Sequence, residues 1–512
     1  MISRAIAGVL VGLLATAASA QDGLGEGTID DRQPTSGPTT REIAATQSSA
    51  ATQLVTTAPA KIDEKAVTGG GELFPDATPE HVLLVTQKVF PAVVRIDVAQ
   101  EIYQDGKKTL RRGIGSGTIF DKQGHILTNY HVAGRGVEFF VTLANKERVK
   151  ARLVGDDHWT DLAVIQMDLD EVKKKGFTFS HADFGTSEKL VPGQDVIAIG
   201  TPFGLARTLT LGVVSNTERT FYPEKQDIDD YETGDFSNWI QMDTPIAPGN
   251  SGGPLVDLSA KIVGVNTRGI QGQSLNFAIP IDTAKRVVEE VLASAADGKK
   301  GRVTRGYLGI DFRPLQDLES FYEIDINKGA LISTVDKNSP ASKAGIKPQD
   351  ILLSINGEAT NIRFPEEIAV VKQLIASMKI GADVDFKFRR GGQEMSASTK
   401  VEKLESKVGE EKEFKAWGLS VRDITRALSL ERRLDDDKGV IVTSVTPGFA
   451  SAKAEIVEGD VIRKVDGKDV EDLEAFQAIY DAAVVAKQQE MLIEIKRGRG
   501  VQSKVLKVSE GK

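Results

Sequence analysis

The chain has no cysteine, which excludes disulfide bonds, thiolate metal sites and a cysteine nucleophile. Histidine is scarce as well, with five in 512 residues, and none stands in a spacing or a carboxylate-flanked pattern typical of a metal site. A basic excess is also lacking, because the formal net charge is −9, and this balance disfavours a nucleic-acid partner. We therefore expect no metal, no cofactor and no nucleic acid.

Apolar runs long enough to cross a bilayer are lacking too. The run at residues 5–17 follows Arg4 and would span only roughly 20 Å as a helix, against a hydrocarbon core of roughly 30 Å. Ala18-Ser19-Ala20 then fits the small-x-small rule for signal-peptide cleavage. We expect residues 1–20 to be a signal peptide. The mature protein would start at Gln21 and be soluble in the periplasm or otherwise secreted, with no stable membrane span.

Large apolar residues are sparse from residue 21 to residue 78, where Thr, Ala, Ser, Gly and Gln dominate. Such a segment cannot bury enough surface to offset the entropy lost on ordering, so we predict a flexible linker. The chain as a whole is 40% hydrophobic and 27% charged, an ordinary globular balance, and is long enough for about three domains.

Short β-type runs broken by glycine fill residues 79–298. Residues 93–96, 117–120, 196–199 and 262–265 are examples. Many short strands with glycine-rich turns favour a pair of β-barrels. Helical patterns at residues 81–90 and 283–293 flank them. We predict a mainly β, double-barrel domain over this range.

The last two hundred or so residues contain an internal repeat. Lys328-Gly329-Ala330-Leu331-Ile332 matches Lys438-Gly439-Val440-Ile441-Val442 at an offset of 110 residues, and the offset persists from Asp350 to Asp460. Helical patterns at 366–378 and 473–486, and alternating strands at 384–389 and 491–496, follow in the two copies. We predict two small α+β domains, at residues 302–402 and 411–511, and name them the first and the second repeat.

Three segments combine residue types that acyl transfer requires. Thr128-Asn129-Tyr130-His131-Val132, Thr160-Asp161-Leu162-Ala163-Val164 and Gly249-Asn250-Ser251-Gly252-Gly253 occur in this order within the β region. A serine hydroxyl is a weak nucleophile, so a neutral imidazole must take its proton and a buried carboxylate must orient the imidazole. Backbone N–H groups at Gly249 and Ser251 could face one point and hold an oxyanion.

Each segment also has a structural interpretation. A glycine-flanked serine is usually a tight turn, a histidine after a strand is more often structural, and Asp161 could cap a strand. Taken together in one glycine-punctuated β region, they favour a catalytic triad of His131, Asp161 and Ser251. We assign His125 and His158 to structure.

These segments resemble the triad motifs of the HtrA/Deg serine proteases, whose trypsin-like domain also matches Gly200-Thr201-Pro202-Phe203-Gly204 and Asn276-Phe277-Ala278-Ile279-Pro280. The two repeats resemble PDZ domains, which often follow the protease in that family. The resemblance implies that His131 is the general base, Asp161 its orienting carboxylate and Ser251 the nucleophile of a serine endopeptidase.

The family's known roles extend this expectation. They imply protein quality control and stress response in the cell envelope, by proteolysis of unfolded or damaged proteins, together with a chaperone role. They also imply homotrimers or multiples of trimers. One departure from the family is the short 101–112 loop, since large assemblies use a longer version.

Specificity follows from positions relative to the nucleophile in trypsin-like folds. The residue six before it lies at the base of the primary pocket, and here it is Pro245, which is no acid. We expect the pocket to accept aliphatic side chains and to reject Lys and Arg, with Phe277, Ala278 and Ile279 as its wall. Asn250 replaces an aspartate that pairs with a cleaved N-terminus in relatives of trypsin, so activation by clipping is not expected.

PDZ domains bind a C-terminal peptide at a sheet edge and hold its carboxylate with backbone N–H groups. In the first repeat we expect Arg305 to add favourable charge. Glu455 replaces Gly345 in the second repeat, where the groove is expected to be altered. The predicted binding loops are Tyr307, Leu308, Gly309 and Ile310 in the first repeat and Gly418, Leu419, Ser420 and Val421 in the second.

Two other functions compete with the endopeptidase. One is a non-catalytic periplasmic chaperone or PDZ scaffold, which the intact triad pattern disfavours. The other is a serine esterase, but the Gly-x-Ser-x-Gly elbow and the βα alternation of that class are missing. The expected partners are unfolded polypeptides and C-terminal peptides.

Overall fold

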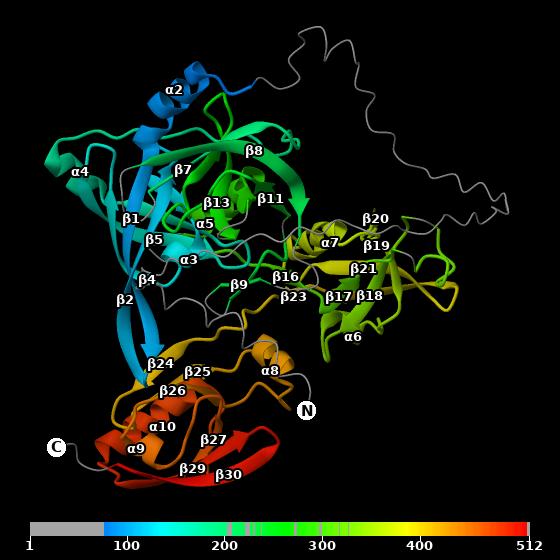
Figure 1. Ribbon diagram of the computed structural model, residues 1–512. Helices are drawn as coiled ribbons and strands as arrows, with labels where there is room; N and C mark the ends of the chain where they lie inside the picture. Colours follow the sequence, from blue (N-terminus) through cyan, green and yellow to red (C-terminus); the bar gives the residue numbers. More distant parts are fainter. Residues whose placement is uncertain are drawn as a thin grey trace, which may run out of the picture. The chain divides into compact units, whose positions relative to one another are not determined.

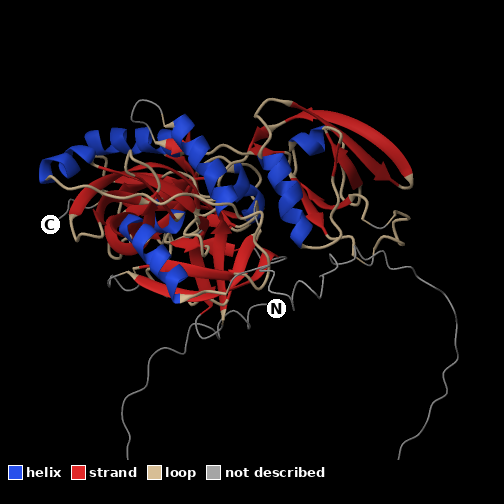
Figure 2. Ribbon diagram, turned by 90° about the horizontal axis from the view of Figure 1, so that it is seen from above, coloured by secondary structure: helices blue, strands red, loops and turns tan. Residues whose placement is uncertain are grey.

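The computed structural model describes residues 76–508, apart from residues 202–206, 221–225, 229–230, 237, 271–273, 296–299, 317 and 326. The expected signal peptide and nearly all of the expected linker lie outside these residues. Strands hold more than twice as many of the described residues as helices do, which confirms the mainly β prediction (Figures 1 and 2). No helix in this part of the chain is long and apolar enough to cross a bilayer.

The first barrel is built from the strands that carry His131 and Asp161 at their ends. Its sheet order is β5-β4-β1-β2-β3-β6, and β6 pairs with β5 to close the ring. The predicted 101–112 loop is the end of an antiparallel hairpin between β1 and β2, with its turn at Asp105 and Gly106. The strands are β1 (Val93–Gln104), β2 (Lys107–Ile119), β3 (His125–Thr128), β4 (Gly136–Thr142), β5 (Arg148–Asp157) and β6 (Leu162–Met167).

The second barrel carries Ser251 between two of its strands. Its closed order is β11-β14-β13-β12-β7-β8. A small hairpin of β9 (Gln226–Ile228) and β10 (Tyr231–Thr233) lies outside the ring. The strands are β7 (Asp195–Gly200), β8 (Thr208–Arg219), β11 (Trp239–Met242), β12 (Pro254–Val256), β13 (Ile262–Ile270) and β14 (Leu275–Pro280).

Helix α2 (Pro79–Lys88) begins and ends two residues before the helical pattern predicted at residues 81–90. Thr78 and His81 form a reciprocal capping box, each side chain accepting from the other's backbone N–H. The remaining helices of this region are the 3-10 turn η1 (Phe90–Ala92), α3 (Tyr130–Ala133), α4 (Leu169–Lys175) and α5 (Ile281–Ser294).

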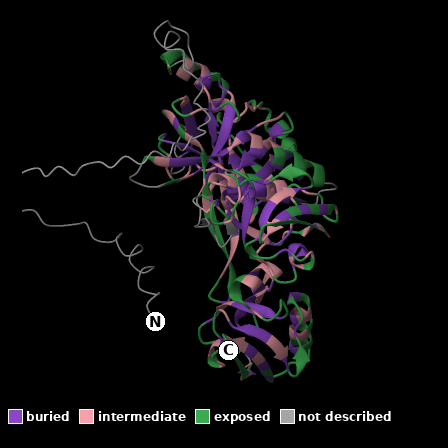
Figure 3. Ribbon diagram, turned by 90° about the vertical axis from the view of Figure 1, so that its right-hand side faces the viewer, coloured by how far each residue is buried: buried purple, intermediate pink, exposed green. Residues whose placement is uncertain are grey.

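One apolar core connects the two barrels. Val94 and Ile165 of the first barrel belong to the same cluster as Ile197 and Ile279 of the second, and α5 adds Val287 and its apolar neighbours. Figure 3 shows these buried segments along the strands. The shared core fixes how the ends of the barrel strands face one another, and the three candidate catalytic residues lie at those ends.

The first repeat has one main sheet in the order β17-β18-β19-β21-β22, with β17 at its edge, and a separate pair of β16 with β23. Its elements are β16 (Gly306–Tyr307), β17 (Ile310–Arg313), β18 (Ala330–Val335), α6 (Pro340–Lys343), β19 (Ile351–Ile355), β20 (Glu358–Ala359), α7 (Glu366–Ala376), β21 (Asp383–Arg390), β22 (Gln393–Lys400) and β23 (Glu402–Lys403). β15 (Gly301–Arg302), just before it, pairs with β5.

The second repeat has the order β24-β25-β26-β27-β29-β30, so that one more strand precedes the equivalent of β17. Its elements are β24 (Glu411–Phe414), β25 (Leu419–Asp423), α8 (Arg426–Arg432), β26 (Val440–Val445), α9 (Ala450–Lys453), β27 (Val461–Val465), β28 (Lys468–Asp469), α10 (Leu473–Val485), β29 (Glu490–Arg497) and β30 (Gly500–Lys507).

A buried carboxylate occupies the same place in both repeats. Asp350 is paired with Arg390 at 2.7 Å, and Asp460 is paired with Arg497 at 2.6 Å. Glu455 adopts a positive φ of 58°, as Gly345 does at 82°, so the substitution leaves the left-handed turn in place. The offset of 110 residues therefore reflects a repeated structure.

Candidate active site

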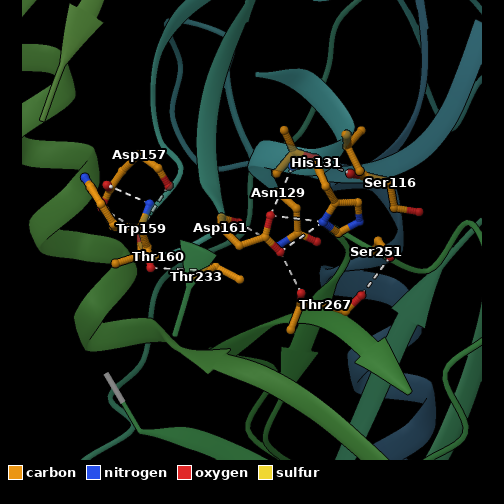
Figure 4. A network of polar contacts seen from close by, with 12 residues as sticks. Ser116, Asn129, His131, Asp157, Trp159, Thr160, Asp161, Thr233, Ser251 and Thr267 are labelled. Carbon is orange, nitrogen blue, oxygen red and sulfur yellow. Dashed lines mark hydrogen bonds and ion pairs between the residues drawn. The ribbon is translucent and has the colours of Figure 1, made fainter. Parts of the chain in front are cut away.

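The side chains of His131 and Asp161 meet at helix α3 (Figure 4). Nδ1 of His131 lies 3.0 Å from Oδ1 and 2.9 Å from Oδ2 of Asp161, and the backbone N–H of His131 donates to Oδ1 at 3.0 Å. Asp161 is 1% exposed. Because a buried acceptor lies beside Nδ1, the imidazole tautomer with its proton on Nδ1 is favoured. Nε2 is then unprotonated and can act as a base.

Three other groups fix the position of Asp161. Thr267 on β13 donates from Oγ1 to Oδ2 at 2.7 Å. The carbonyl oxygen of Asp161 accepts from the backbone N–H of Tyr130 and from Nδ2 of Asn129, both at 3.0 Å. The φ angle of Asp161 is 58°, a left-handed conformation that Asp tolerates better than most residues. Its carboxylate therefore joins His131 of the first barrel to Thr267 of the second.

Ser251 lies in the turn between β11 and β12, and Figure 4 shows it across the imidazole of His131 from Asp161. Its Oγ donates to the carbonyl oxygen of Thr267 at 2.9 Å. To be deprotonated by His131, the hydroxyl must leave Thr267 and turn towards Nε2. The structure thus brings the three predicted residues together, with the serine hydrogen-bonded to a backbone acceptor.

The turn around Ser251 presents two backbone donors. Among the described residues, no acceptor lies within hydrogen-bond distance of the N–H groups of Gly249 and Ser251. Ser116 holds the turn from the first barrel, because its Oγ donates to the carbonyl of Gly249 at 2.6 Å and its N–H to that of Ser251 at 2.8 Å. Such a pair of donors beside a nucleophile can stabilise an oxyanion.

The two glycines after Ser251 are required by close backbone contacts. A Cβ on Gly252 would lie 2.2 Å from the carbonyl oxygen of Ser116, and one on Gly253 would lie 2.1 Å from that of Ile199. Neither site has room for a larger residue, which explains the Ser-Gly-Gly sequence sterically.

Ser116, Asn129 and Thr267 are site residues that the sequence reasoning missed. Ser116 had a local signal, since it lies between Gly115 and Gly117, and Asn129 immediately precedes the triad histidine segment. Thr267 had none, because only the packing of β13 against the first barrel places it on Asp161.

The four residues predicted for the primary pocket, and Asn250, which we also assign to substrate binding, lie in different surroundings. Pro245 is exposed, and its carbonyl oxygen accepts from Thr210 at 3.1 Å. Asn250 is 3% exposed and its carbonyl accepts from Gly253. Phe277 packs edge-on against Trp239. The structure places Ala278 and Ile279 among the side chains of two apolar cores.

Asn276, which the pocket prediction left out, lies on β14 and bonds to the residue that follows Pro245. Its Oδ1 accepts from the backbone N–H of Ile246 at 3.2 Å. The same oxygen lies 2.2 Å from where a Cβ of Gly269 would stand. The amide oxygen therefore lies close to both Ile246 and Gly269.

The predicted loop of the first repeat has two available donors. Among the described residues, the N–H groups of Leu308 and Gly309 have no acceptor, and Gly309 has a φ of 75°. The expectation that Arg305 adds charge to this loop is wrong, because Arg305 is buried and ion-paired with Asp157. Arg426 is a cation that does lie near the loop, over the ring of Tyr307 at 5.3 Å.

The equivalent loop of the second repeat begins two residues before the predicted one. The carbonyl of Leu308 accepts from Ala341, as that of Trp417 accepts from Ser451, and Gly418 has a φ of 71° like Gly309. Residues 416–419 therefore correspond to residues 307–310. The glycine with positive φ is the third residue of the loop in the first repeat, whereas the predicted loop of the second repeat begins with that glycine. Aligning the two glycines therefore moves the second loop back by two residues.

Burial sets the protonation of two side chains near these sites. It lowers the pKa of His158 to about 4, with a small opposing contribution from Asp157. Burial, followed by the hydrogen bond to Asp336, raises the pKa of the Tyr307 hydroxyl well above its ordinary value. Nδ1 of His125 lies within hydrogen-bond distance of Oδ2 of Asp121, at 2.6 Å. The assignment of His125 and His158 to structural roles stays a prediction.

Three segments of the chain match known domain families. Residues 115–265 match the trypsin-like peptidase domain, and residues 306–401 and 408–489 each match the PDZ domain.

The chain is also similar to proteins of known type. It is 32% identical over 402 residues to a DegP-like periplasmic serine endoprotease of Chlamydia muridarum, covering 77% of this chain and 75% of the relative. It is 37% identical over 320 residues to the Do-like serine protease HtrA of Bacillus subtilis, covering 59% of this chain and 66% of that protein. A solved structure of the HtrA-type protease AlgW with a decapeptide matches with a TM-score of 0.51 and 26% identity, over 63% of this chain and 98% of that one.

Thr267→Val removes the hydrogen bond to Asp161 without changing the volume of the side chain. A hydrogen bond to a charged group is worth about 1.5–3 kcal/mol, so kcat/KM for a peptide substrate should fall about 10- to 100-fold. Thr267→Ser keeps the hydroxyl and should restore most of the activity. Equal activity of the valine and serine variants, or a shared loss that follows protein stability, would contradict the positioning role.

His158 should make folding sensitive to mild acid. Its pKa of about 4 in the folded state lies below the 6.5 expected after unfolding, so the unfolded chain binds the extra proton between these values. Stability should therefore decrease as the pH falls from 6.5 towards 4, by at most about 1.4 kcal/mol per pH unit. Urea midpoints across this range should decrease less in His158→Gln than in the wild type. His125→Gln, the control, should keep the decrease.

Proposed function

Since the chain belongs to the HtrA/DegP family of serine endoproteases and carries two PDZ domains, we propose that it cleaves unfolded or damaged polypeptides through His131, Asp161 and Ser251. The observation that carries this proposal is the buried Asp161 carboxylate bonded to His131 beside Ser251. The names of the relatives support a periplasmic location. We extend the proposal to homotrimers or multiples of trimers.

The proposed reaction begins with the Ser251 hydroxyl turning from Thr267 to His131. Nε2 of His131 takes the proton as Oγ attacks the substrate carbonyl carbon, and the carbonyl oxygen becomes an oxyanion held by the N–H groups of Gly249 and Ser251. Asp161 stabilises the imidazolium formed. His131 then gives its proton to the leaving amine, the peptide C–N bond breaks, and water hydrolyses the acyl-enzyme by the same route.

The PDZ domains would bring substrate or activating peptides to this site. The available N–H groups of Leu308 and Gly309 suit the carboxylate of a C-terminal peptide, and the edge of β17 suits its backbone. The decapeptide in the AlgW structure is a ligand of that protein, and it supports peptide ligands for this chain too. A chaperone role beside proteolysis would use the same contacts. A non-catalytic scaffold is the weaker alternative, because all three triad residues are present.

Peptide binding can reach the catalytic residues through the segment before Asp161. Asp157 is ion-paired with Arg305 at the start of the first PDZ domain, and Trp159 clusters with Phe236 and Ala376. Figure 4 includes Asp157 and Trp159 in the same network of polar contacts as Asp161. A peptide that prefers one arrangement of this segment would shift its population, to the extent of its differential affinity.

Ser251→Ala tests the nucleophile. We expect a loss of about 10⁶-fold in turnover of unfolded casein, with the fold retained, because the attacking oxygen is removed. Cleavage is read by gel and fold by circular dichroism. The same substitution at Ser116 is not an inert control, so Ser259→Ala in an exposed turn serves instead and should keep wild-type activity. Casein cleavage by Ser251→Ala near the wild-type rate would refute the assignment.

A peptide library tests the pocket. With Pro245 in place of an acid and Asn276 bonded to Ile246, cleavage should occur after Val, Ala or Ile. One methylene in such a pocket is worth roughly 1–3 kcal/mol, so the preference should be graded. Mass spectrometry of the products identifies the residue before each cut. A profile dominated by Arg or Lys would contradict the proposed pocket.

A short chromogenic peptide, too small to reach a PDZ domain, tests the coupling. Adding a separate peptide with a free hydrophobic C-terminus should accelerate its hydrolysis if binding shifts the active site. Gly309→Ala should abolish the response, because the new Cβ would stand 2.2 Å from Ser339. If calorimetry confirms binding but the rate is unchanged, the PDZ domain only tethers substrate and the coupling is excluded.

A further inference from the structure

The two PDZ domains differ at the sheet edge where a peptide would add. In the first, β17 is the edge strand of its sheet within the described residues. In the second, the equivalent strand β25 is already paired on that side with β24, antiparallel, from Glu411 opposite Arg422 to Phe414 opposite Leu419. A C-terminal peptide also adds antiparallel, with its last residue at the loop. β24 therefore occupies the position and the direction of a ligand.

Phe414, the last residue of β24, stands where the final side chain of such a peptide would lie. It is 0% exposed and belongs to the core of the domain. Its ring packs edge-on against Phe476 at 4.7 Å and against Tyr480 at 4.9 Å, both on α10. Since α10 and β25 form the two walls of the groove, an aromatic side chain of the chain itself fills it.

The loop donors are also occupied. The carbonyl oxygen of Phe414 accepts from the N–H of Gly418 at 2.9 Å and from that of Trp417 at 3.1 Å. In the first domain the matching N–H groups, of Gly309 and Leu308, have no acceptor among the described residues. The internal carbonyl thus takes the place that a terminal carboxylate would take. Tyr480 fixes the turn as well, since its hydroxyl accepts from the N–H of Ala416 at 3.0 Å.

We propose that Glu411–Phe414 is an internal ligand that fills the peptide groove of the second PDZ domain, so that only the first domain binds free C-terminal peptides. The inference rests on the proposed peptide-binding function of the PDZ domains and assigns it to one of them. A free peptide would have to displace a buried aromatic side chain and two backbone hydrogen bonds that are intramolecular. The internal segment has the advantage of a high effective concentration.

Calorimetry on the full chain carrying Ser251→Ala tests the inference without proteolysis. The probe is a ten-residue peptide with a free C-terminal phenylalanine. We expect one peptide per chain, and at least a 100-fold loss of affinity when Gly309→Ala is added. Phe414→Ala should create a second site, whereas the matched control Phe414→Leu should keep the groove filled and the stoichiometry at one.

Two sites per chain with Phe414 intact, or a single site that survives Gly309→Ala, would overturn the inference. A Phe414→Ala variant that folds but binds no second peptide would also overturn the inference. The same holds if none of the variants binds peptide. That last result would also remove peptide binding from the proposed function, while casein cleavage and its loss in Ser251→Ala would remain as separate evidence for the protease.

If Phe414→Ala unfolds the domain, amide hydrogen exchange on the chain with Phe414 intact tests the inference instead. The amides of Trp417 and Gly418 should exchange slowly without peptide and should not change when peptide is added. The amides of Leu308 and Gly309 should exchange fast and slow down with peptide. Fast exchange at Gly418 that peptide slows would refute the internal ligand.

Discussion

The carboxylate of Asp161 is the group on which the arrangement of the active site depends. It accepts hydrogen bonds from the backbone and ring of His131 in the first barrel and from Thr267 in the second. A buried carboxylate requires such hydrogen bonds to replace those that water would make. The requirement ties the two barrels together where the imidazole must be oriented.

The nucleophile is positioned from the same interface. Ser116 of the first barrel bonds to both carbonyls of the turn that carries Ser251, and the glycines after Ser251 allow the close approach. Ser116 of the first barrel therefore positions the turn of Ser251, and Thr267 of the second barrel positions Asp161. A small relative shift of the barrels would change the donor geometry at Gly249 and Ser251 and the distance from Ser251 to His131, which offers a physical basis for regulation in a protein that must avoid indiscriminate proteolysis.

The two PDZ domains share a fold but differ at the sheet edge where a peptide would add. Their buried Asp–Arg pairs and left-handed turns coincide at the same places. The chain that enters each domain differs, however. β16 leaves the edge of β17 to pair with β23, whereas β24 turns back at residues 415–418 and pairs with β25. The edge of β17 is thereby unpaired within the described residues, and β24 contributes Phe414 to a core that includes Trp417 and Phe476.

Much of this protein is determined by local sequence. Alternation of apolar residues and glycine punctuation predicted the mainly β barrels, the offset of 110 residues predicted the two repeats, and the three short motifs identified the candidate triad. These features are readable because strand periodicity, turns and short motifs involve neighbours in the chain. The tertiary structure alone placed Thr267 on Asp161, moved Arg305 to Asp157, buried Ala278 and Ile279 in cores, and set β24 against β25. Some of those contacts join residues that are distant in sequence, and others depend on which strand a segment pairs with. Tertiary packing determines the contacts of both kinds.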